Sequence, residues 1–201
     1  MIFPIVAFGD PVLKTLAKPL PATFPAAELD LLIANMYETM YHAHGVGLAA
    51  PQVGKGIRLF VIDSTPMLDE DEDGNPLVEE PTAAPVKRAF INPQMLSETG
   101  EPWAFEEGCL SIPGIRERVM RCPVIRLRYE DEQRQVHEET FSGLTARVIQ
   151  HEYDHLEGVL FTDYTSGLRK QLLKGKLARI SKGDVDADYR MRFAAPAGSR
   201  R

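Results

Sequence analysis

The sequence predicts an α+β fold in a single compact domain over residues 1–201, with short mixed or antiparallel sheets around a central helix and a further C-terminal helix. Its 201 residues are close to the size of one domain. Hydrophobic residues make up 44% and charged residues 26%, which is the balance of a globular chain. Helical and strand patterns are mixed without the regular alternation of a parallel α/β fold.

Three helices are predicted. The first covers residues 25–44, where apolar residues recur at helical spacing and Gly45 follows as a stop signal. The recurring side chains are those of Leu29, Leu32, Ile33, Met36 and Met40. The second helix is predicted over residues 144–157, with Gly158 after it, and the third, which is basic, over residues 168–180.

Strands are predicted where short β-branched or aromatic runs are bounded by turn residues. These runs are residues 58–63, 89–92, 124–129 and 135–141. Residues 182–201 form a C-terminal tail, in which residues 189–193 are expected to add a strand. The tail is not expected to contact the sequence motifs described below.

Acidic residues are concentrated in one segment. Residues 66–81 are predicted to form a solvated loop insertion, because Asp69–Glu80 carries seven acidic residues and no basic one. Asp69, Asp71, Asp73, Gly74 and Glu80 match the spacing of a calcium-binding EF-hand loop. The helices that flank such a loop are not predicted here, and three prolines oppose them, so a plain acidic insertion is favoured.

The remaining composition excludes several classes of partner. The chain has 23 basic and 29 acidic residues, and most of the difference comes from the acidic segment, so no specific nucleic-acid site is predicted. No apolar run approaches the length of a membrane span, and the N-terminus lacks the pattern of a secretory signal. We therefore expect a cytoplasmic protein without a membrane partner, with free thiols at Cys109 and Cys122.

The main candidates for metal-binding and catalytic residues lie in the second predicted helix, where QHEYDH contains the pattern H-E-x-x-H. His151 and His155 share a helix face and can bind one metal ion, with Glu152 beside it. Leu144 and Val148 precede them on the same apolar stripe, so the imidazoles are expected to point inward, where they need a polar partner. Two hydrogen-bonded surface histidines are the alternative.

A catalytic metal site of this type takes three protein ligands, so a third must come from elsewhere in the chain. The long metalloprotease signature is excluded, because Phe161 stands where its last histidine would bind. The candidates are His42, His44, His137, Glu157 and Cys109. Cys109 lies in a turn-rich stretch where Gly108 is expected to supply a tight bend, and a thiolate suits a transition metal.

The segment GVGLAAPQ, residues 45–52, follows the first predicted helix. It fits the dinucleotide pattern G-x-G-x-x-A, but that pattern must follow a strand, which argues against nucleotide binding. Its glycines let the backbone approach a substrate closely, and Gln52 offers a side-chain N–H to an oxyanion. A helix stop followed by a plain loop is the alternative.

In this order, GVGLAAPQ, EGCLSIP and QHEYDH resemble the three signature motifs of the peptide deformylases, metal-dependent hydrolases that remove the formyl group from N-formylmethionyl peptides. The resemblance covers most of the chain and implies that Cys109, His151 and His155 bind the metal. Family members commonly hold Fe(II), which Zn(II) or Ni(II) can replace. One divalent transition metal ion is therefore expected, with Fe(II) as the first choice.

The resemblance also implies how the reaction proceeds. Glu152 would accept a proton from the attacking water and pass it to the departing amine. The amide of Gln52 and the backbone N–H of Leu110 would stabilise the oxyanion. A different metallohydrolase and a binding module with a structural metal are the alternatives, although Glu152 and Gln52 have no role in a purely structural site.

The substrate is expected to bind beside the same motifs. The main chain at Val46 and Gly47 would pair with the peptide as an added strand. Val46, Leu144 and Val148 would line an apolar pocket for the methionine side chain. The implied partners are N-formylmethionyl nascent peptides, with a transient ribosome contact, and the protein is expected to be a monomer.

Overall fold

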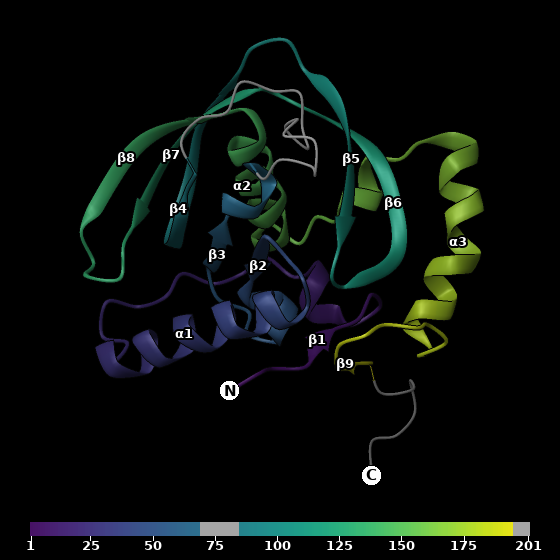
Figure 1. Ribbon diagram of the computed structural model, residues 1–201, viewed down its shortest axis with the longest axis horizontal. Coiled ribbons are helices and arrows are strands. Elements are labelled where there is room, and N and C mark those ends of the chain that lie inside the picture. The colour runs from purple at the N-terminus through teal and green to yellow at the C-terminus, as the bar shows by residue number, and fades with distance from the viewer. Residues whose placement is uncertain (69–84, 195–201) are drawn as a thin grey trace.

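The computed structural model describes residues 1–68 and 85–194 (Figure 1). Its helices are α1 (Ala26–His42), α2 (Gly143–Leu156) and α3 (Gly167–Ser181). Its strands are β1 (Ile5–Val6), β2 (Gly47–Ala49), β3 (Leu59–Asp63), β4 (Lys87–Thr99), β5 (Trp103–Cys109), β6 (Ile112–Arg121), β7 (Val124–Glu130), β8 (Val136–Ser142) and β9 (Met191–Arg192). The mixture of helices and mainly antiparallel sheets confirms the α+β class.

The sheets surround α2. One antiparallel sheet has the strand order β2-β3-β4-β7-β8, β5 and β6 form an antiparallel hairpin, and β1 pairs in parallel with β9. Figure 1 shows α2 between the larger sheet and the hairpin, with α1 packed on β2 and β3 and α3 outside β6. The helix that carries H-E-x-x-H is therefore central, as predicted.

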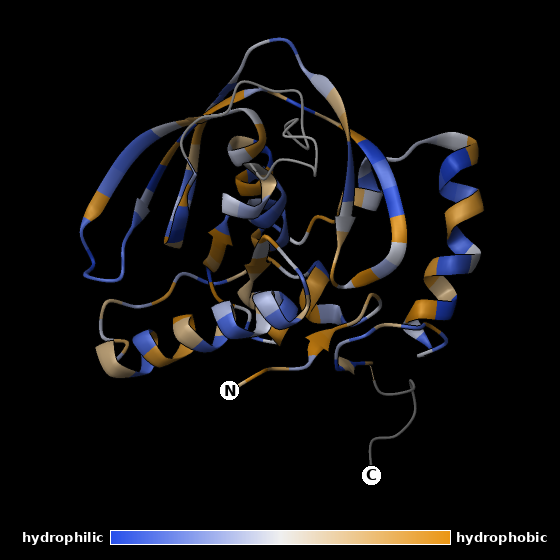
Figure 2. Ribbon diagram, viewed as in Figure 1, coloured by the Kyte–Doolittle hydropathy of each residue, from blue (hydrophilic) through white to orange (hydrophobic). Residues whose placement is uncertain are grey.

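Strand β3 is buried along its whole length. Its residues are apolar except for the last, Asp63, and Figure 2 accordingly shows the strand mainly in orange. Leu59 and Val61 pack in the cluster that contains the buried face of α1, whereas Phe60 and Ile62 pack with residues of α2. A strand covered on both faces reads as a continuous apolar run, which explains why this strand was predictable. Strand β3 therefore lies between α1 and α2 and positions the two helices relative to each other.

The first helix is shorter than predicted at both ends, yet its five predicted apolar positions are all buried. Helix α2 ends before Gly158, which has a φ of 71°. A Cβ at Gly158 would lie 2.8 Å from the carbonyl carbon of Lys14, so glycine is required both by conformation and by packing.

Strand β4 continues past the predicted end at Asn92 and reaches Thr99. The prediction stopped before Pro93 because proline interrupts strand pairing. In the structure the pairing with β7 shifts between Ile91 and Gln94, and Asn92 adopts a φ of 50°. Such an irregularity accommodates a proline within a strand. The β5–β6 hairpin was not predicted, because it contains glycine and proline and because charged residues occupy buried as well as exposed positions.

The C-terminal tail returns to the N-terminus. Strand β9 lies within the predicted residues 189–193 and pairs with β1 through Ile5 with Met191 and Val6 with Arg192. The EF-hand-like pattern and most of the predicted acidic insertion lie outside the described residues. Among the described residues, no helix combines the length and apolar character needed to cross a membrane.

Candidate functional site

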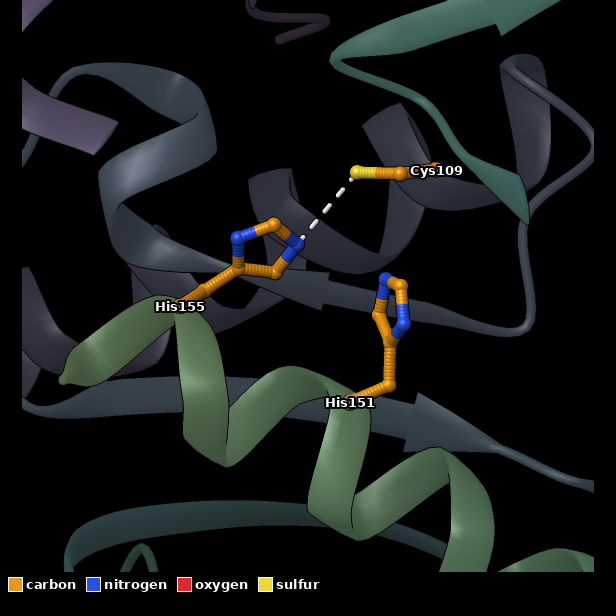
Figure 3. Close-up of side chains that lie close together, drawn as sticks. All are labelled: Cys109, His151 and His155. Atoms are coloured by element: carbon orange, nitrogen blue, oxygen red, sulfur yellow. Dashed lines mark hydrogen bonds between the residues drawn. The ribbon is translucent and has the colours of Figure 1, made fainter. Parts of the chain in front are cut away.

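The two histidines of H-E-x-x-H project from one face of α2 toward the end of β5, where Cys109 lies (Figure 3). Gly108 is a strand residue outside the positive-φ region, so the predicted bend at Gly108 is wrong. The chain reverses after Cys109, which pairs with Ile112 across a turn formed by Leu110 and Ser111. The reversal places the thiol at the tip of the hairpin, facing α2.

The side chains of Cys109, His151 and His155 form a compact set of donors. Their candidate ligand atoms all lie within 4.8 Å of one another, and Cys109 Sγ lies 3.3 Å from His155 Nε2. Burial lowers the pKa of His155 well below its usual range, which favours the neutral imidazole that binds metals. One sulfur and two imidazole nitrogens suit a borderline transition metal.

The other candidate ligands lie elsewhere. His137 contacts Asp131 at 2.6 Å, Glu157 pairs with Arg58 at 2.7 Å, and His44 lies 3.8 Å from Asp188. His42 is exposed at the end of α1. Cys109 is therefore the candidate that the fold brings to the two histidines.

Glu107 orients His151 from behind. Its Oε2 accepts a hydrogen bond from His151 Nδ1 at 3.0 Å. Burial opposes its ionisation, but hydrogen bonds from His151 and Arg121 outweigh this and hold the pKa of Glu107 well below its usual range. Because an ionised carboxylate only accepts hydrogen bonds, Nδ1 donates to Glu107, and Nε2 is the ring nitrogen left to bind a metal.

A buried charge network surrounds Glu107. Arg121 donates to both of its oxygens and also to Asp154, and Arg147 donates to Glu107 at 2.7 Å. Sequence reasoning missed these residues. The available signal was Arg147, one turn before His151 in a helix whose neighbouring residues are apolar, because a buried guanidinium needs a buried acid.

Glu152 is buried beside the two histidines, with 4% of its surface exposed. Its Oε2 makes no hydrogen bond within the described residues, and burial raises the pKa of the Glu152 carboxyl to about 7. The carboxylate packs against the α-carbon of Gly47, where an added Cβ would lie 2.8 Å from Glu152 Cδ. The glycine therefore makes room for this acid.

Gln52 reaches the site from the short 3₁₀ helix that follows β2. Its Oε1 accepts from the backbone N–H of Ala49 at 2.8 Å, so its amide nitrogen faces Cys109 Sγ and Ser111 Oγ, each at 3.4 Å. Leu110 follows Cys109 directly, so its N–H belongs to the same turn. Two N–H donors are thus available close to the thiol.

A cavity of about 530 Å³ opens at these residues. Its walls come from the 44–47 segment, the β5–β6 hairpin and α2, and they include Val46, Gly47, Val148 and Arg116. Leu144, which we predicted to line this pocket, is buried and is not one of the lining residues. The walls are mainly apolar, and Cys109, His151 and Glu152 are among the titratable residues that line them.

The C-terminal tail contacts the motif EGCLSIP, so the expectation that the tail would not contact the motifs is wrong. Tyr189 donates a hydrogen bond from its hydroxyl to the carbonyl of Leu110 at 2.8 Å. The pairing of β9 with β1 brings the tail to the hairpin, a long-range contact that periodicity along the chain does not indicate.

Comparison with known proteins identifies the family. The sequence profile described as polypeptide deformylase matches residues 2–171. The chain belongs to this family. A peptide deformylase of Christiangramia forsetii is 55% identical over 193 residues, which is 96% of each chain, and one of Flavobacterium johnsoniae is 53% identical over the whole of both chains. A crystal structure of a peptide deformylase from Thermotoga maritima superposes with a TM-score of 0.69 at 40% identity, covering 83% of this chain and 99% of that one.

As a member of the polypeptide deformylase family, the chain is a hydrolase that removes the N-formyl group from nascent polypeptides. The predicted family, fold class and reaction are confirmed. The family and the Cys109, His151 and His155 group together indicate one bound metal ion. The buried Oε2 of Glu152, without a partner among the described residues, fits a site that takes a water beside a metal ion.

Proposed function

We propose that Cys109, His151 and His155 hold the metal ion at which a formyl amide is hydrolysed, and that Glu152, Gln52 and Leu110 assist the reaction. The observation that carries this assignment is the convergence of the three donor groups within 4.8 Å beside a cavity. This cavity is lined by Cys109, His151, Glu152 and Gln52. Three protein ligands leave a coordination position free for chemistry, as catalytic sites require.

The peptide binds along the free edge of β2. This strand ends the larger sheet and is paired only with β3 among the described strands, so its other edge, which begins at Gly47, can accept an added strand. Val46 directly precedes this edge, and its carbonyl accepts from the N–H of Asp63 at 2.9 Å. Val46 and Val148 are wall residues that suit the methionine side chain. Leu144 supports this wall from behind, since it is buried one turn before Val148.

A bound metal ion supplies Lewis acidity, which lowers the pKa of a water and polarises the formyl carbonyl. Glu152 accepts a proton from the attacking water, for which its unpartnered oxygen is placed. The Gln52 amide and the Leu110 N–H donate hydrogen bonds to the oxygen of the formyl group as negative charge develops there. The C–N bond then breaks, Glu152 returns the proton to the amine, and formate leaves.

We infer that Fe(II) is the native metal, because members of this family commonly hold it. Zn(II) or Ni(II) can replace it, because one thiolate and two imidazoles suit all three ions. A thiolate bound to Fe(II) would be sensitive to oxygen. We further propose that residues 1–201 act as one monomeric catalytic domain in the cytoplasm, in transient contact with the ribosome where formylated chains emerge.

The experiment that tests this function measures formate release from formyl-Met-Ala-Ser by anaerobically purified protein, with metal content determined on the same sample. Release is expected with about one transition metal ion per chain, and chelation should abolish it. Acetyl-Met-Ala-Ser is the matched substrate, and equal cleavage of both peptides would contradict formyl specificity. Absence of formate release at full metal occupancy would point to another acyl group.

The role of Glu152 is tested by Glu152→Gln, which keeps the shape of the side chain. Loss of a general base is expected to lower kcat about 10²- to 10⁴-fold while metal content stays unchanged. Glu138→Gln is the control, because Glu138 is exposed on β8, pairs with Arg126 and is not one of the residues that line the cavity. Full activity of metal-loaded Glu152→Gln would refute the assignment.

A further inference from the structure

The turn that carries Leu110 is held by both ends of the chain. Leu110 and Ser111 are the two residues between paired Cys109 and Ile112. The carbonyl of Ser111 accepts from the backbone N–H of Phe8 at 2.9 Å, and the carbonyl of Leu110 accepts from the Tyr189 hydroxyl at 2.8 Å. Both carbonyls of the turn are thus bound by segments far away in sequence.

The tail that presents Tyr189 is itself anchored. The carbonyl of Arg190 accepts from the N–H of Ile5, and that of Arg192 accepts from the N–H of Ala7, each at 2.8 Å. The Tyr189 ring is half-buried against the cluster that contains the buried face of α1. Its hydroxyl is therefore a fixed donor, and its backbone lies outside the catalytic motifs.

Two-residue turns at hairpin tips are the part of a hairpin least restrained by strand pairing. Here the tip must keep a side-chain ligand and a backbone donor in fixed positions, because an oxyanion site depends on preorganised donors. The hydrogen bond from the Tyr189 hydroxyl holds the Leu110 carbonyl in place. Removing this hydrogen bond leaves the peptide group after Leu110 free to rotate. The N–H of Leu110 then loses its fixed orientation.

We propose that Tyr189 is a positioning residue for deformylation: its hydroxyl holds the Leu110–Ser111 turn so that the N–H of Leu110 points at the developing oxyanion. This inference rests on the role of Leu110 in the proposed function. The C-terminal tail, in which we expected no link to chemistry, then takes part in catalysis without touching substrate.

The test is Tyr189→Phe in the full chain, loaded with metal. We expect kcat for formyl-Met-Ala-Ser to fall about 10-fold, less than the 10²- to 10³-fold loss that follows removal of an oxyanion donor itself. KM should change less than about twofold, because the variant leaves the pocket walls intact. Metal content should equal that of the wild type, and amide hydrogen exchange of Ile112, which pairs with Cys109 across the turn, should become faster.

Tyr37→Phe is the matched control, since the Tyr37 hydroxyl also faces a backbone carbonyl, that of Ile62 at 3.5 Å, and the residue is outside the cavity wall. It should leave kcat and exchange at the turn unchanged. An unchanged kcat in Tyr189→Phe would overturn the proposal. So would a fall in kcat that occurs without faster amide exchange, or a fall in kcat that is proportional to a loss of bound metal. A metal-loaded wild type that releases no formate would instead overturn the proposed function.

Discussion

Two side chains of the candidate site are each held by a hydrogen bond at one polar atom and present a second polar atom to the cavity. His151 donates from Nδ1 to Glu107, and Gln52 accepts at Oε1 from the N–H of Ala49. The remaining atoms, Nε2 of His151 and Nε2 of Gln52, are thereby oriented without a ligand present. Such preorganisation lowers the cost of rearrangement when substrate and transition state bind.

The contact between Gly47 and Glu152 leads to a prediction at this scale. Gly47→Ala should displace the Glu152 carboxylate, because the new Cβ would lie 2.8 Å from its Cδ. We expect kcat/KM for a formylated peptide to fall about 10-fold or more, since small misplacements of a catalytic group have large effects on rate. Metal content should remain unchanged.

Gly56→Ala serves as the control for Gly47→Ala. A Cβ at Gly56 meets only Val12 Cγ2, at 4.0 Å, so the substitution adds no clash. Steady-state kinetics on both variants separates a local clash from the general effect of replacing glycine. Wild-type kinetics in Gly47→Ala would show that Glu152 does not need this space.

At the scale of elements, the charge network joins α2 to the β5–β6 hairpin. Arg121 of β6 binds Glu107 of β5 and Asp154 of α2, and both Arg121 and Glu107 are buried. The network therefore sets the distance between the histidines on the helix and the cysteine on the hairpin. It stabilises the fold only while every buried charge keeps its partners.

We predict that Arg121→Leu lowers the free energy of unfolding by about 3 kcal/mol, because it leaves Glu107 and Asp154 with fewer partners in a buried site. Metal affinity should also fall about 10-fold, since Glu107 orients His151. Urea denaturation and metal titration measure the two effects.

The control for Arg121→Leu is Arg126→Leu, which removes an arginine from the exposed pair with Glu138. Exposed pairs contribute little, so a loss below about 1 kcal/mol is expected. Equal losses in the two variants would mean that the buried network has no special structural role.

At the scale of the whole molecule, the site joins segments from all parts of the chain. The cavity is formed by residues 44–47, the β5–β6 hairpin and α2. The pairing of β1 with β9 brings residues 5–6 next to residues 191–192. A ligand bound by several such elements stabilises the native state relative to the unfolded one. Metal occupancy should therefore affect the stability of the whole fold.

We predict that chelation abolishes formate release and lowers the melting temperature by about 10 °C, as expected for the loss of about 4 kcal/mol of binding free energy in a chain of this size. Thermal unfolding with and without chelator measures this shift, and Fe(II), Zn(II) and Ni(II) are then added back singly. Cys109→Ser should show a much smaller response to the chelator. An unchanged melting temperature in the metal-loaded wild type would contradict this coupling.

Local patterns in the sequence were enough to predict the α+β class, the ranges of the helices to within two residues, and the residues of the three motifs. They were enough because amphipathic spacing, glycine stops and the i, i+4 relation of His151 and His155 act over a few residues. The reaction was predicted from the resemblance of the motifs to a known family. The five apolar positions of α1 and the run in β3 followed from the same local periodicity.

Local patterns left the third ligand open and the family resemblance implied Cys109, which the tertiary structure places beside the two histidines. Tertiary structure alone decided what supports these ligands and where the tail lies. Cys109 was one of five candidate ligands, and the contacts of Glu107, Arg121 and Tyr189 link residues far apart in the chain. Hydrogen bonds and ion pairs across such separations leave no periodic signal. They depend on strand register and packing, which the β5–β6 hairpin and the β1–β9 pair provide.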